Sequence, residues 1–550
     1  MAMTKNESKS KGFGFIMDTL DDLVEKNHIV RAYESCIDWN FIYPLVEHLY
    51  SKDFGAPSID PVILFKLVFL NYTQGIHSMR KTCEECKYNI AYRWFLGINL
   101  HDKIPDHSTY SQNYRRKFAK TNIFEQIFTT ILETCYEKGH IRDEVIFGDA
   151  THVKASANKR KSRNEVIKIG VKAYQEELDK DINEDRMKHG KKPLKTTHYQ
   201  FKNEDKQELE SDVTDDELIK YDDAEDIVDI NGDGEDMEDE ISTVDPETGE
   251  VKTKKLKQMK TKNIKVSKTD PDCGMYHKGE KEKMFAYSVS AVSDRFGFVL
   301  AAHVTSGNIH DSVSFYGLMK SYQKYNKDAK TKTVCLDAGY YVPSVLKYIF
   351  DAGQVPLVPY TRPKSKDGFF KKLDYVYDEM YDQYICPNNK LLDYTNTNKE
   401  GYKVYKSNPR DCNDCPFLTK CTNSKNKTKV IARHVWEEYK EMAHDERHKL
   451  VNRPIYKKRK ETIERVFGDG KENYGLRYTR YRGLEKVTNH ILVLFSAMNF
   501  KKIARWEKMK KDMVNNADIL IRFMQNIIKN HIYEKKRPIQ LRISTSLSTS

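Results

Sequence analysis

The sequence YKKRKETIERVFGDGKENYGLRYTRYR, residues 456–482, places one carboxylate on an apolar-striped helix that is crowded with cations. Its apolar residues follow the i, i+3, i+4 spacing of a helix packed on a core: Ile463, Val466 and Phe467. Glu464 stands beside that stripe, and Lys460 and Lys471 lie four residues before it and seven after it, on its face. Such a carboxylate suits a metal ion that works on phosphate, although a surface helix with ordinary Lys/Glu pairs is the simpler alternative.

Two aspartates upstream favour the metal interpretation. Residues 145–147 and 334–336 are short apolar runs typical of buried strands, and they precede Asp149 and Asp337. An aspartate at the end of a central strand is a common metal ligand, whereas the alternative is an aspartate that caps the following turn. Phosphodiester transfer uses two Mg²⁺ ions about 4 Å apart, which bind carboxylate oxygens. Asp149, Asp337 and Glu464 are therefore candidate ligands, with Lys154 and Lys471 as candidate phosphate contacts.

The order of the predicted elements indicates the fold. After the first strand and a long insertion, residues 285–292 and 298–304 read as a hairpin, followed by a helix, the strand before Asp337, a helix and a strand at 355–360. A mixed α/β chain with one antiparallel hairpin is the ribonuclease H-like pattern, in which two strand aspartates and a glutamate on a later helix meet.

The charge of the chain points to a polyanion partner. The tract 211–250 holds 18 acidic residues and one lysine, a net charge of −17. The whole 550-residue chain has a net charge of +12, so the residues outside the tract carry +29. A chain this basic outside one tract is typical of nucleic-acid-binding proteins. The longest apolar run, 61–70, is broken by Lys66, so we expect no membrane span. Ten cysteines do not form a disulfide scaffold, which favours a cytoplasmic protein.

Residues 1–135 read as helices without strand alternation. Ser108 is a candidate N-cap for a helix that ends in Arg115 and Arg116. The block is either a helix-turn-helix type DNA reader or a packing and dimerisation module.

Residues 160–270 are rich in charge and poor in apolar residues, so we expect a flexible insertion. Within the acidic tract, residues 229–240 match the calcium-loop template from Asp229 to Glu240. Such a match arises by chance in an acidic tract. A solvated insertion, or an internal competitor for the DNA-binding surface, is the other interpretation.

A second insertion, 361–445, contains four clustered cysteines: Cys386, Cys412, Cys415 and Cys421. Four soft ligands, two of them in a C-x-x-C, suit a closed structural Zn²⁺ site. Four reduced thiols in a loosely packed insertion are the alternative.

Several stretches together resemble DDE-type transposases of bacterial insertion sequences. They are GDATHVKASANK from residue 148, HVTSGNIHDS from 303, CLDAGYY from 335, IERVFGDGKENYGLRYTRYRGLEK from 463, and RWFLGINLHDKIPDHSTYSQNYRRKF from 93. The family signature is Tyr, two residues, Arg, three residues, Glu, six residues, Lys. Glu464 and Lys471 keep that spacing, while Tyr456 and Arg459 lie one residue too far upstream.

The resemblance implies the site residues, metal ions, partner and domains of the chain. Asp149, Asp337 and Glu464 form the catalytic triad and bind two Mg²⁺ ions, which Mn²⁺ can replace, and Tyr456, Arg459, Lys460 and Lys471 contact DNA. Double-stranded DNA, as element ends and as target, is the partner of a homodimer. The domains are helical 1–135, catalytic 136–510 with both insertions, and a basic tail 511–550. A nuclease without strand transfer, or a domesticated DNA-binding protein, is the alternative.

Overall fold

The computed structural model describes residues 18–51, 58–158, 160–168, 175–194, 239–244, 251–256, 261–278, 282–360 and 368–535. The chain divides into two compact units. One comprises Met1–Ile123 with Ala497–Ser550, and the other is Phe124–Ser496.

The first unit is all-helical, as the sequence predicts. Its helices are α1 (Leu20–Leu23), α2 (Ile29–Cys36), α3 (Ile42–Val46), α4 (Pro61–Thr73), α5 (Met79–Tyr88), α6 (Ile90–Leu96) and α7 (His107–Asn113), with a π-helical turn at Tyr114–Phe118. Trp39 packs edge-to-face on Phe69, Phe95 and Phe500, with ring centroids 5.3–5.6 Å apart. This aromatic cluster forms the centre of the unit's core.

The prediction for the start of α7 was wrong by two residues. The N-cap is Asp106, whose Oδ1 accepts a hydrogen bond from the backbone N–H of Ser108 at 2.8 Å. A carboxylate satisfies a free amide of the first turn as well as a hydroxyl does, so the helix begins at the earlier of the two candidates.

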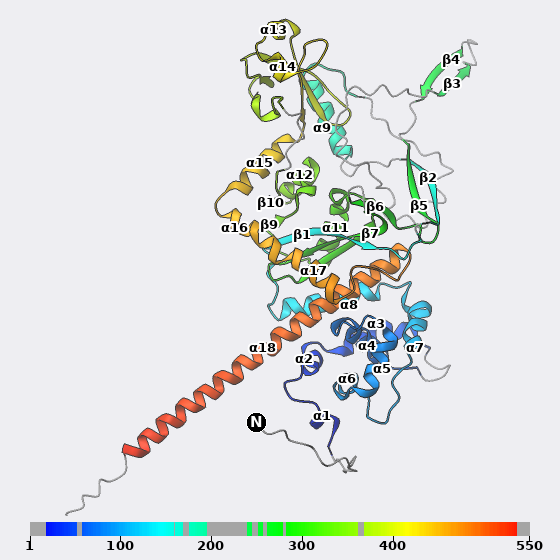
Figure 1. Cartoon of the computed structure of the whole chain (residues 1–550), viewed down its shortest axis with the longest axis vertical. Coiled ribbons are helices and arrows are strands. Elements are labelled where there is room, and N and C mark those ends of the chain that lie inside the picture. Colours follow the sequence, from blue (N-terminus) through cyan, green and yellow to red (C-terminus); the bar gives the residue numbers. More distant parts are fainter. Residues whose placement is uncertain are drawn as a thin grey trace, which may run out of the picture. The chain divides into compact units, whose positions relative to one another are not determined.

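The second unit contains a six-stranded mixed sheet. Its strands are β1 (Val145–Lys154), β6 (Gly274–Lys278), β7 (Glu282–Ser293), β8 (Val299–Ser306), β9 (Thr333–Cys335) and β10 (Val355–Leu357). The order is β10-β9-β1-β7-β6, with β8 also pairing to β7 (Figure 1). β7 is antiparallel to β1 and β8, whereas β9 is parallel to β1 and β10. The ribonuclease H-like fold class is thereby confirmed.

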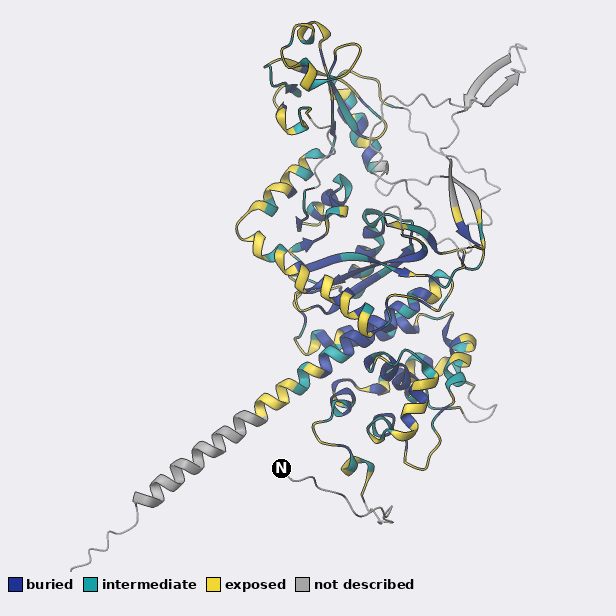
Figure 2. Ribbon diagram, viewed as in Figure 1, coloured by how far each residue is buried: buried dark blue, intermediate teal, exposed yellow. Residues whose placement is uncertain are grey.

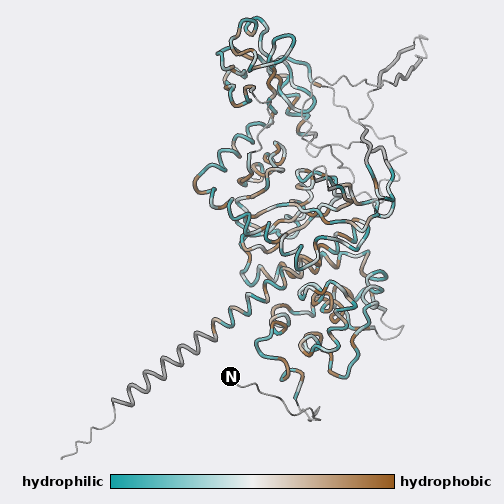
Figure 3. Tube along the Cα trace, in the orientation of Figure 1, coloured by the Kyte–Doolittle hydropathy of each residue, from teal (hydrophilic) through white to brown (hydrophobic). Residues whose placement is uncertain are grey.

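Helices cover the sheet. The main ones in this unit are α8 (Ile123–Glu137), α11 (Asp311–Tyr325), α12 (Pro343–Asp351), α15 (Glu437–His448), α16 (Asn452–Lys457), α17 (Ile463–Asn473) and the start of α18 (Leu484–Lys535). α11 packs on β7 and β8, and α17 packs on β1 and β7, so the strands between them are buried (Figure 2). The hydrophilic α15 and α16 lead into α17 (Figure 3).

A five-stranded antiparallel sheet lies in the insertion before α15. Its strands are β11 (Val376–Asp378), β12 (Gln383–Ile385), β13 (Leu391–Thr397), β14 (Tyr402–Ser407) and β15 (Val430–His434), in that order. Its core gathers Tyr375, Tyr384, Leu392, Tyr405 and Ile431. Two short helices, α13 (Pro409–Asn413) and α14 (Leu418–Cys421), connect its last two strands.

The charged insertion 160–270 contains a helix that its composition did not predict. α9 (Gln175–Lys188) buries Leu178 and Ile182 against Trp436, whose Nε1–H donates to Asp181 Oδ2 at 2.7 Å. Two antiparallel strand pairs also occur, β2 (Ser162–Lys168) with β5 (Thr261–Ser267) and β3 (Asp239–Val244) with β4 (Val251–Leu256). Residues 195–238, with nearly all of the calcium-like loop 229–240, lie outside the described residues.

α18 begins in a strongly apolar stretch, and Ile491, Leu494 and Phe495 are buried there. Of the helices in the described ranges, none combines the length and apolarity needed to cross a membrane.

Candidate active site

Asp149 and Asp337 occupy equivalent places on two neighbouring parallel strands. Phe147 is the last residue of β1 that pairs with β9, and its partner is Cys335. Asp149 lies two residues beyond the first and Asp337 two residues beyond the second, so both leave the same edge of the β1–β9 pairing. The two carboxylates also interact electrostatically, since the charge of Asp337 contributes to raising the pKa of Asp149.

The prediction that the first strand ends at Asp149 was wrong. β1 continues to Lys154, because residues 147–154 pair with β7 after the pairing with β9 has stopped. At Asp149, β1 therefore pairs with β7 on one side and no longer with β9 on the other. Asp337 caps the 3₁₀ turn Ala338–Tyr340 and accepts a hydrogen bond from the backbone N–H of Ala338 at 2.7 Å.

Glu464 comes from α17, at the second residue of the helix. Ile463, Val466 and Phe467 are buried on the sheet side of α17, which confirms the predicted apolar stripe. Because Glu464 flanks that stripe, its side chain is partly exposed, at 44%. The helix thus presents the carboxylate at the margin of its contact with β1 and β7.

Arg459 joins two of the three carboxylates. Its Nη2 lies 2.7 Å from Asp149 Oδ2, and its Nη1 donates to Glu464 Oε1 at 2.9 Å. The guanidinium is nearly buried, with 8% of the side chain exposed. An ion pair with each carboxylate therefore fixes Glu464 beside the central sheet.

The altered spacing of Arg459 is absorbed by a break in the backbone. Arg459 lies in a 3₁₀ turn, Lys458–Glu461, and Thr462 then leaves the helical conformation, with φ −108° and ψ −96°, before α17 begins. The turn and the break bring Arg459 back to Glu464 although five positions separate them. Tyr456 is half-buried, with the Arg447 guanidinium 5.3 Å from its ring centroid.

Burial controls the electrostatics of Asp149. Desolvation raises the pKa of its carboxyl from 3.8 to about 6, although the Arg459 guanidinium and the N–H of Ala150 act in the opposite direction. Negative charge on Asp337 and Asp311 adds to the increase. A buried carboxyl surrounded by other carboxylates is the situation that a bound divalent cation relieves.

Asp311 is a fourth carboxylate at this site, and the sequence reasoning gave it no role. It is the first residue of α11, and burial raises its pKa, with a further contribution from the charge of Asp337. His310, the N-cap of α11, opposes that increase. The motif HVTSGNIHDS contains Asp311, but an acidic residue in a first helical turn is ordinary, so no signal separated it from a structural role.

The cations that the sequence predicts to contact DNA lie on several different elements. Lys154 and Lys460 are exposed and Lys471 is half-buried. The backbone of Lys154 bonds to Arg477 and Thr479, which ties the segment after α17 to the end of β1. His152 stacks on Tyr276 with ring centroids 3.5 Å apart. Arg115 and Arg116 are exposed on the π-helical turn of the other unit.

The carboxylates of Asp149, Asp337 and Glu464 do not converge on one point. Among the described residues, the only group of three or more acidic, His or Cys side chains with ligand atoms within 4.8 Å of one another is Asp185, His189 and Asp382. The ligand atoms of Asp149, Asp337 and Glu464 therefore do not all lie within 4.8 Å of one another, and Arg459 contacts two of these residues.

Two family models match the chain. The first, described as Transposase domain (DUF772), matches residues 18–116 and so covers α1 to α7. The second, described as Transposase DDE domain, matches residues 385–504, which include Glu464 and the four clustered cysteines. These two segments of the chain are therefore similar to transposase domains. Searches of curated proteins and of solved structures returned no match.

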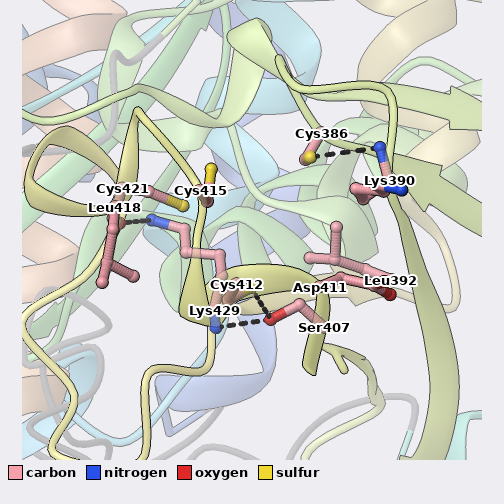
Figure 4. Close-up of a pocket in the computed structure, with 10 residues that line it drawn as sticks. All are labelled: Cys386, Lys390, Leu392, Ser407, Asp411, Cys412, Cys415, Leu418, Cys421 and Lys429. Carbon is pink, nitrogen blue, oxygen red and sulfur yellow. Dashed lines mark hydrogen bonds between the residues drawn. The ribbon is translucent and has the colours of Figure 1, made fainter. Parts of the chain in front are cut away.

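The four clustered cysteines lie around one small cavity. Cys386, Cys412, Cys415 and Cys421 line a space of about 20 Å³, enough for one water-sized occupant (Figure 4). Cys386 Sγ accepts a hydrogen bond from the backbone N–H of Lys390 at 3.3 Å, and Cys421 Sγ lies 3.0 Å from the Tyr375 hydroxyl. No three of these sulfur atoms lie within 4.8 Å of one another.

The cluster of Asp185, His189 and Asp382 joins the end of α9 to the five-stranded sheet. His189 Nε2 lies 2.7 Å from Asp382 Oδ2, and Lys403 Nζ lies 2.6 Å from Asp185 Oδ1 and 3.5 Å from Asp382 Oδ2. Hydroxyls of Tyr377 and Tyr405 donate to Asp382 as well. The lysine already supplies the cation between the two carboxylates, so this cluster is a partly buried ion-pair network.

Proposed function

We propose that the chain is a transposase that cleaves the ends of its insertion sequence and joins them to target DNA, with Asp149, Asp337 and Glu464 as ligands of two divalent metal ions. The observation that carries this proposal is the equivalent placement of Asp149 and Asp337 beyond the β1–β9 pairing, with Glu464 linked to Asp149 through Arg459. The similarity of residues 18–116 and 385–504 to transposase domains supports DNA transposition itself.

The residues of the chain fit the metal. Three carboxylates, with Asp311 beside them, supply the hard oxygen ligands that Mg²⁺ or Mn²⁺ requires. Two such ions, when bound, activate the attacking water or 3′-hydroxyl and stabilise the leaving oxygen. Asp149 lies on β1, which pairs with β7 and contacts α17, and 19% of its side chain is exposed.

Basic side chains position the DNA in this proposal. Lys154, Lys460 and Lys471 contact the phosphate backbone around the cleaved bond, while Arg115 and Arg116 bind DNA through the helical unit. These contacts fix position and carry no sequence information. Two copies of the chain, one at each end of the element, act as a homodimer on DNA in the cytoplasm, the compartment that the cysteine usage favours.

Joining of a pre-cleaved end tests the strand-transfer step. The substrate is the element's terminal DNA with an exposed 3′-hydroxyl, mixed with supercoiled target plasmid and Mg²⁺. Covalently joined product that disappears with a 3′-dideoxy end supports transposition, because the 3′-hydroxyl is then the nucleophile. Cleavage without joining contradicts strand transfer and leaves a hydrolytic nuclease.

We also propose that the four clustered cysteines hold one structural Zn²⁺. Four sulfur ligands fit its preference, and a bound ion would draw the sulfurs to the spacing of about 3.8 Å that Zn–S bonds of roughly 2.3 Å impose. The metal would fix the turns after β12 and around α13 and α14, which the small core of the five-stranded sheet supports only in part.

Metal content of the purified full chain tests this site. One equivalent of zinc is expected in the wild type, lost in Cys412→Ser and retained in Cys83→Ala, which alters a buried cysteine of the other unit. Four cysteines that react freely with a thiol reagent in the folded wild type, together with absence of zinc, would contradict the proposal.

A further inference from the structure

Arg459 uses the same oxygen atoms that a bound metal ion would use. Its two terminal nitrogens contact Asp149 Oδ2 and Glu464 Oε1, at 2.7 and 2.9 Å. One planar cation thus bridges two carboxylates that would otherwise repel each other.

The bonding of Arg459 is incomplete. The contact with Asp149 is an ion pair without the alignment of a hydrogen bond, and no described residue accepts from Nε, although Arg459 is only 7% exposed. A buried guanidinium normally has its N–H groups satisfied. The guanidinium therefore forms ion pairs with both carboxylates while two of its nitrogen atoms, Nε and Nη2, lack a hydrogen-bond acceptor among the described residues.

Arg459 and Glu464 also belong to different elements. Arg459 lies in the 3₁₀ turn Lys458–Glu461, which the break at Thr462 separates from α17. The guanidinium can leave the carboxylates by movement of its side chain or its turn, while α17 keeps its buried contact with β1 and β7.

We propose that Arg459 is a placeholder for the metal, which holds Asp149 and Glu464 together in the metal-free transposase and must release both when a divalent ion binds. This inference rests on the proposed function, because it assumes that those carboxylates are metal ligands. Arg459 is a positioning residue in this account, and it weakens metal binding by competing with the ion for its ligands.

Binding of Mn²⁺ alone to the DNA-free full-length protein tests the proposal without reference to activity. Free Mn²⁺ is counted from its electron paramagnetic resonance signal during a titration. Arg459→Met is expected to bind Mn²⁺ about tenfold more tightly than wild type, the change that corresponds to removing a competitor worth about 1.4 kcal/mol. Unchanged or weaker binding would overturn the proposal.

Arg465→Met is the matched control. Arg465 is exposed and adjoins Glu464 on α17, so the variant removes one positive charge near the site without removing the bridge. It is expected to change Mn²⁺ affinity by less than about twofold, as a screened surface charge does. Equal tightening in Arg465→Met and Arg459→Met would show a general charge effect and overturn the placeholder.

Arg459→Lys covers the case in which Arg459→Met does not fold. A lysine keeps the charge but cannot bridge two carboxylates with one planar group, so tightening of smaller size is expected. Glu464→Gln distinguishes failure of the metal-ligand assignment from failure of the placeholder. If Glu464→Gln loses Mn²⁺ while the Arg459 variants match wild type, the ligand assignment stands and the placeholder fails. If wild type and the Arg459 variants bind Mn²⁺ no more tightly than Glu464→Gln does, the ligand assignment and the placeholder both fail.

Discussion

Asp149 and Asp337 each stand two residues beyond the last pair of the parallel strands β1 and β9, Phe147 with Cys335. The relationship follows from strand register, so it depends on the packing that holds the two strands together. It also explains why the two carboxylates interact electrically although 188 positions separate them in the chain.

Gly148 is needed for that packing. A Cβ at this position would lie 2.6 Å from Leu336 Cδ2, the side chain that precedes Asp337. We expect Gly148→Ala to destabilise the protein by roughly 1–3 kcal/mol, because a buried methyl group must displace Leu336. Urea unfolding of the purified variant measures the loss.

Gly339→Ala is the control for this prediction, since a Cβ there meets nothing within 4 Å. It should have little effect on the free energy of unfolding. The losses caused by Gly148→Ala and Leu336→Ala should be less than additive in the double variant, as expected for two residues in contact. Equal stability of Gly148→Ala and wild type would contradict the close approach.

Asp149 should make the stability of the metal-free protein depend on pH. Its pKa is raised from 3.8 to about 6 by burial, so the folded state holds a proton that the unfolded state has released between these values. The stability linked to the protonated form is complete below pH 3.8 and is lost as the pH rises through about 6. The loss is at most about 3 kcal/mol.

Chemical unfolding in EDTA between pH 4 and 7 measures this dependence. Asp149→Asn should flatten the curve relative to wild type, whereas Asp469→Asn, which changes an exposed carboxylate of α17, should not. Cleavage with Mg²⁺ should fall as the pH drops below about 6, because a protonated carboxyl is a poor metal ligand. Parallel curves for Asp149→Asn and wild type would refute the raised pKa.

The ion-pair network under α9 should hold that helix on the five-stranded sheet. Asp185 is 7% exposed and bonds to Lys403 and to the Thr397 hydroxyl. Asp185→Ala leaves Lys403 without its nearer carboxylate, so a loss of roughly 2–4 kcal/mol in the free energy of unfolding is expected. Limited proteolysis should then cut within 175–194 earlier than in wild type.

Glu184→Ala is the comparison on the same helix. Glu184 pairs with Lys180 at 3.9 Å on an exposed surface, and such pairs contribute little to stability. Similar proteolysis of Asp185→Ala and wild type would mean that the other contacts of α9, among them Leu178 and Ile182 with Trp436, hold the helix without Asp185.

The sequence pattern was sufficient for the fold because the buried strands are short apolar runs in a fixed order. The runs before Asp149 and Asp337 and the hairpin at 285–304 all appear as strands. The stripe Ile463, Val466 and Phe467 likewise predicted the face of α17. In these segments local pattern and tertiary packing favour the same structure.

Other features depend on contacts that local pattern does not encode. The reach of Arg459 depends on the break at Thr462, and the extension of β1 to Lys154 depends on pairing with β7. α9 carries a short apolar pair, Leu178 and Ile182, within a highly charged stretch, and only Trp436 from a distant segment makes that pair a packing face.

Cleavage and joining of the element's own terminal DNA with Mg²⁺ by wild type, Glu464→Gln and Glu461→Gln is the most direct measurement of the central claim. Glu461 is an exposed carboxylate three residues before Glu464, so its variant controls for charge. The account predicts that Glu464→Gln loses both reactions, by at least about 10³-fold as expected for a lost metal ligand, while Glu461→Gln keeps both. Activity in Glu464→Gln equal to that of Glu461→Gln would contradict the assignment of the three carboxylates.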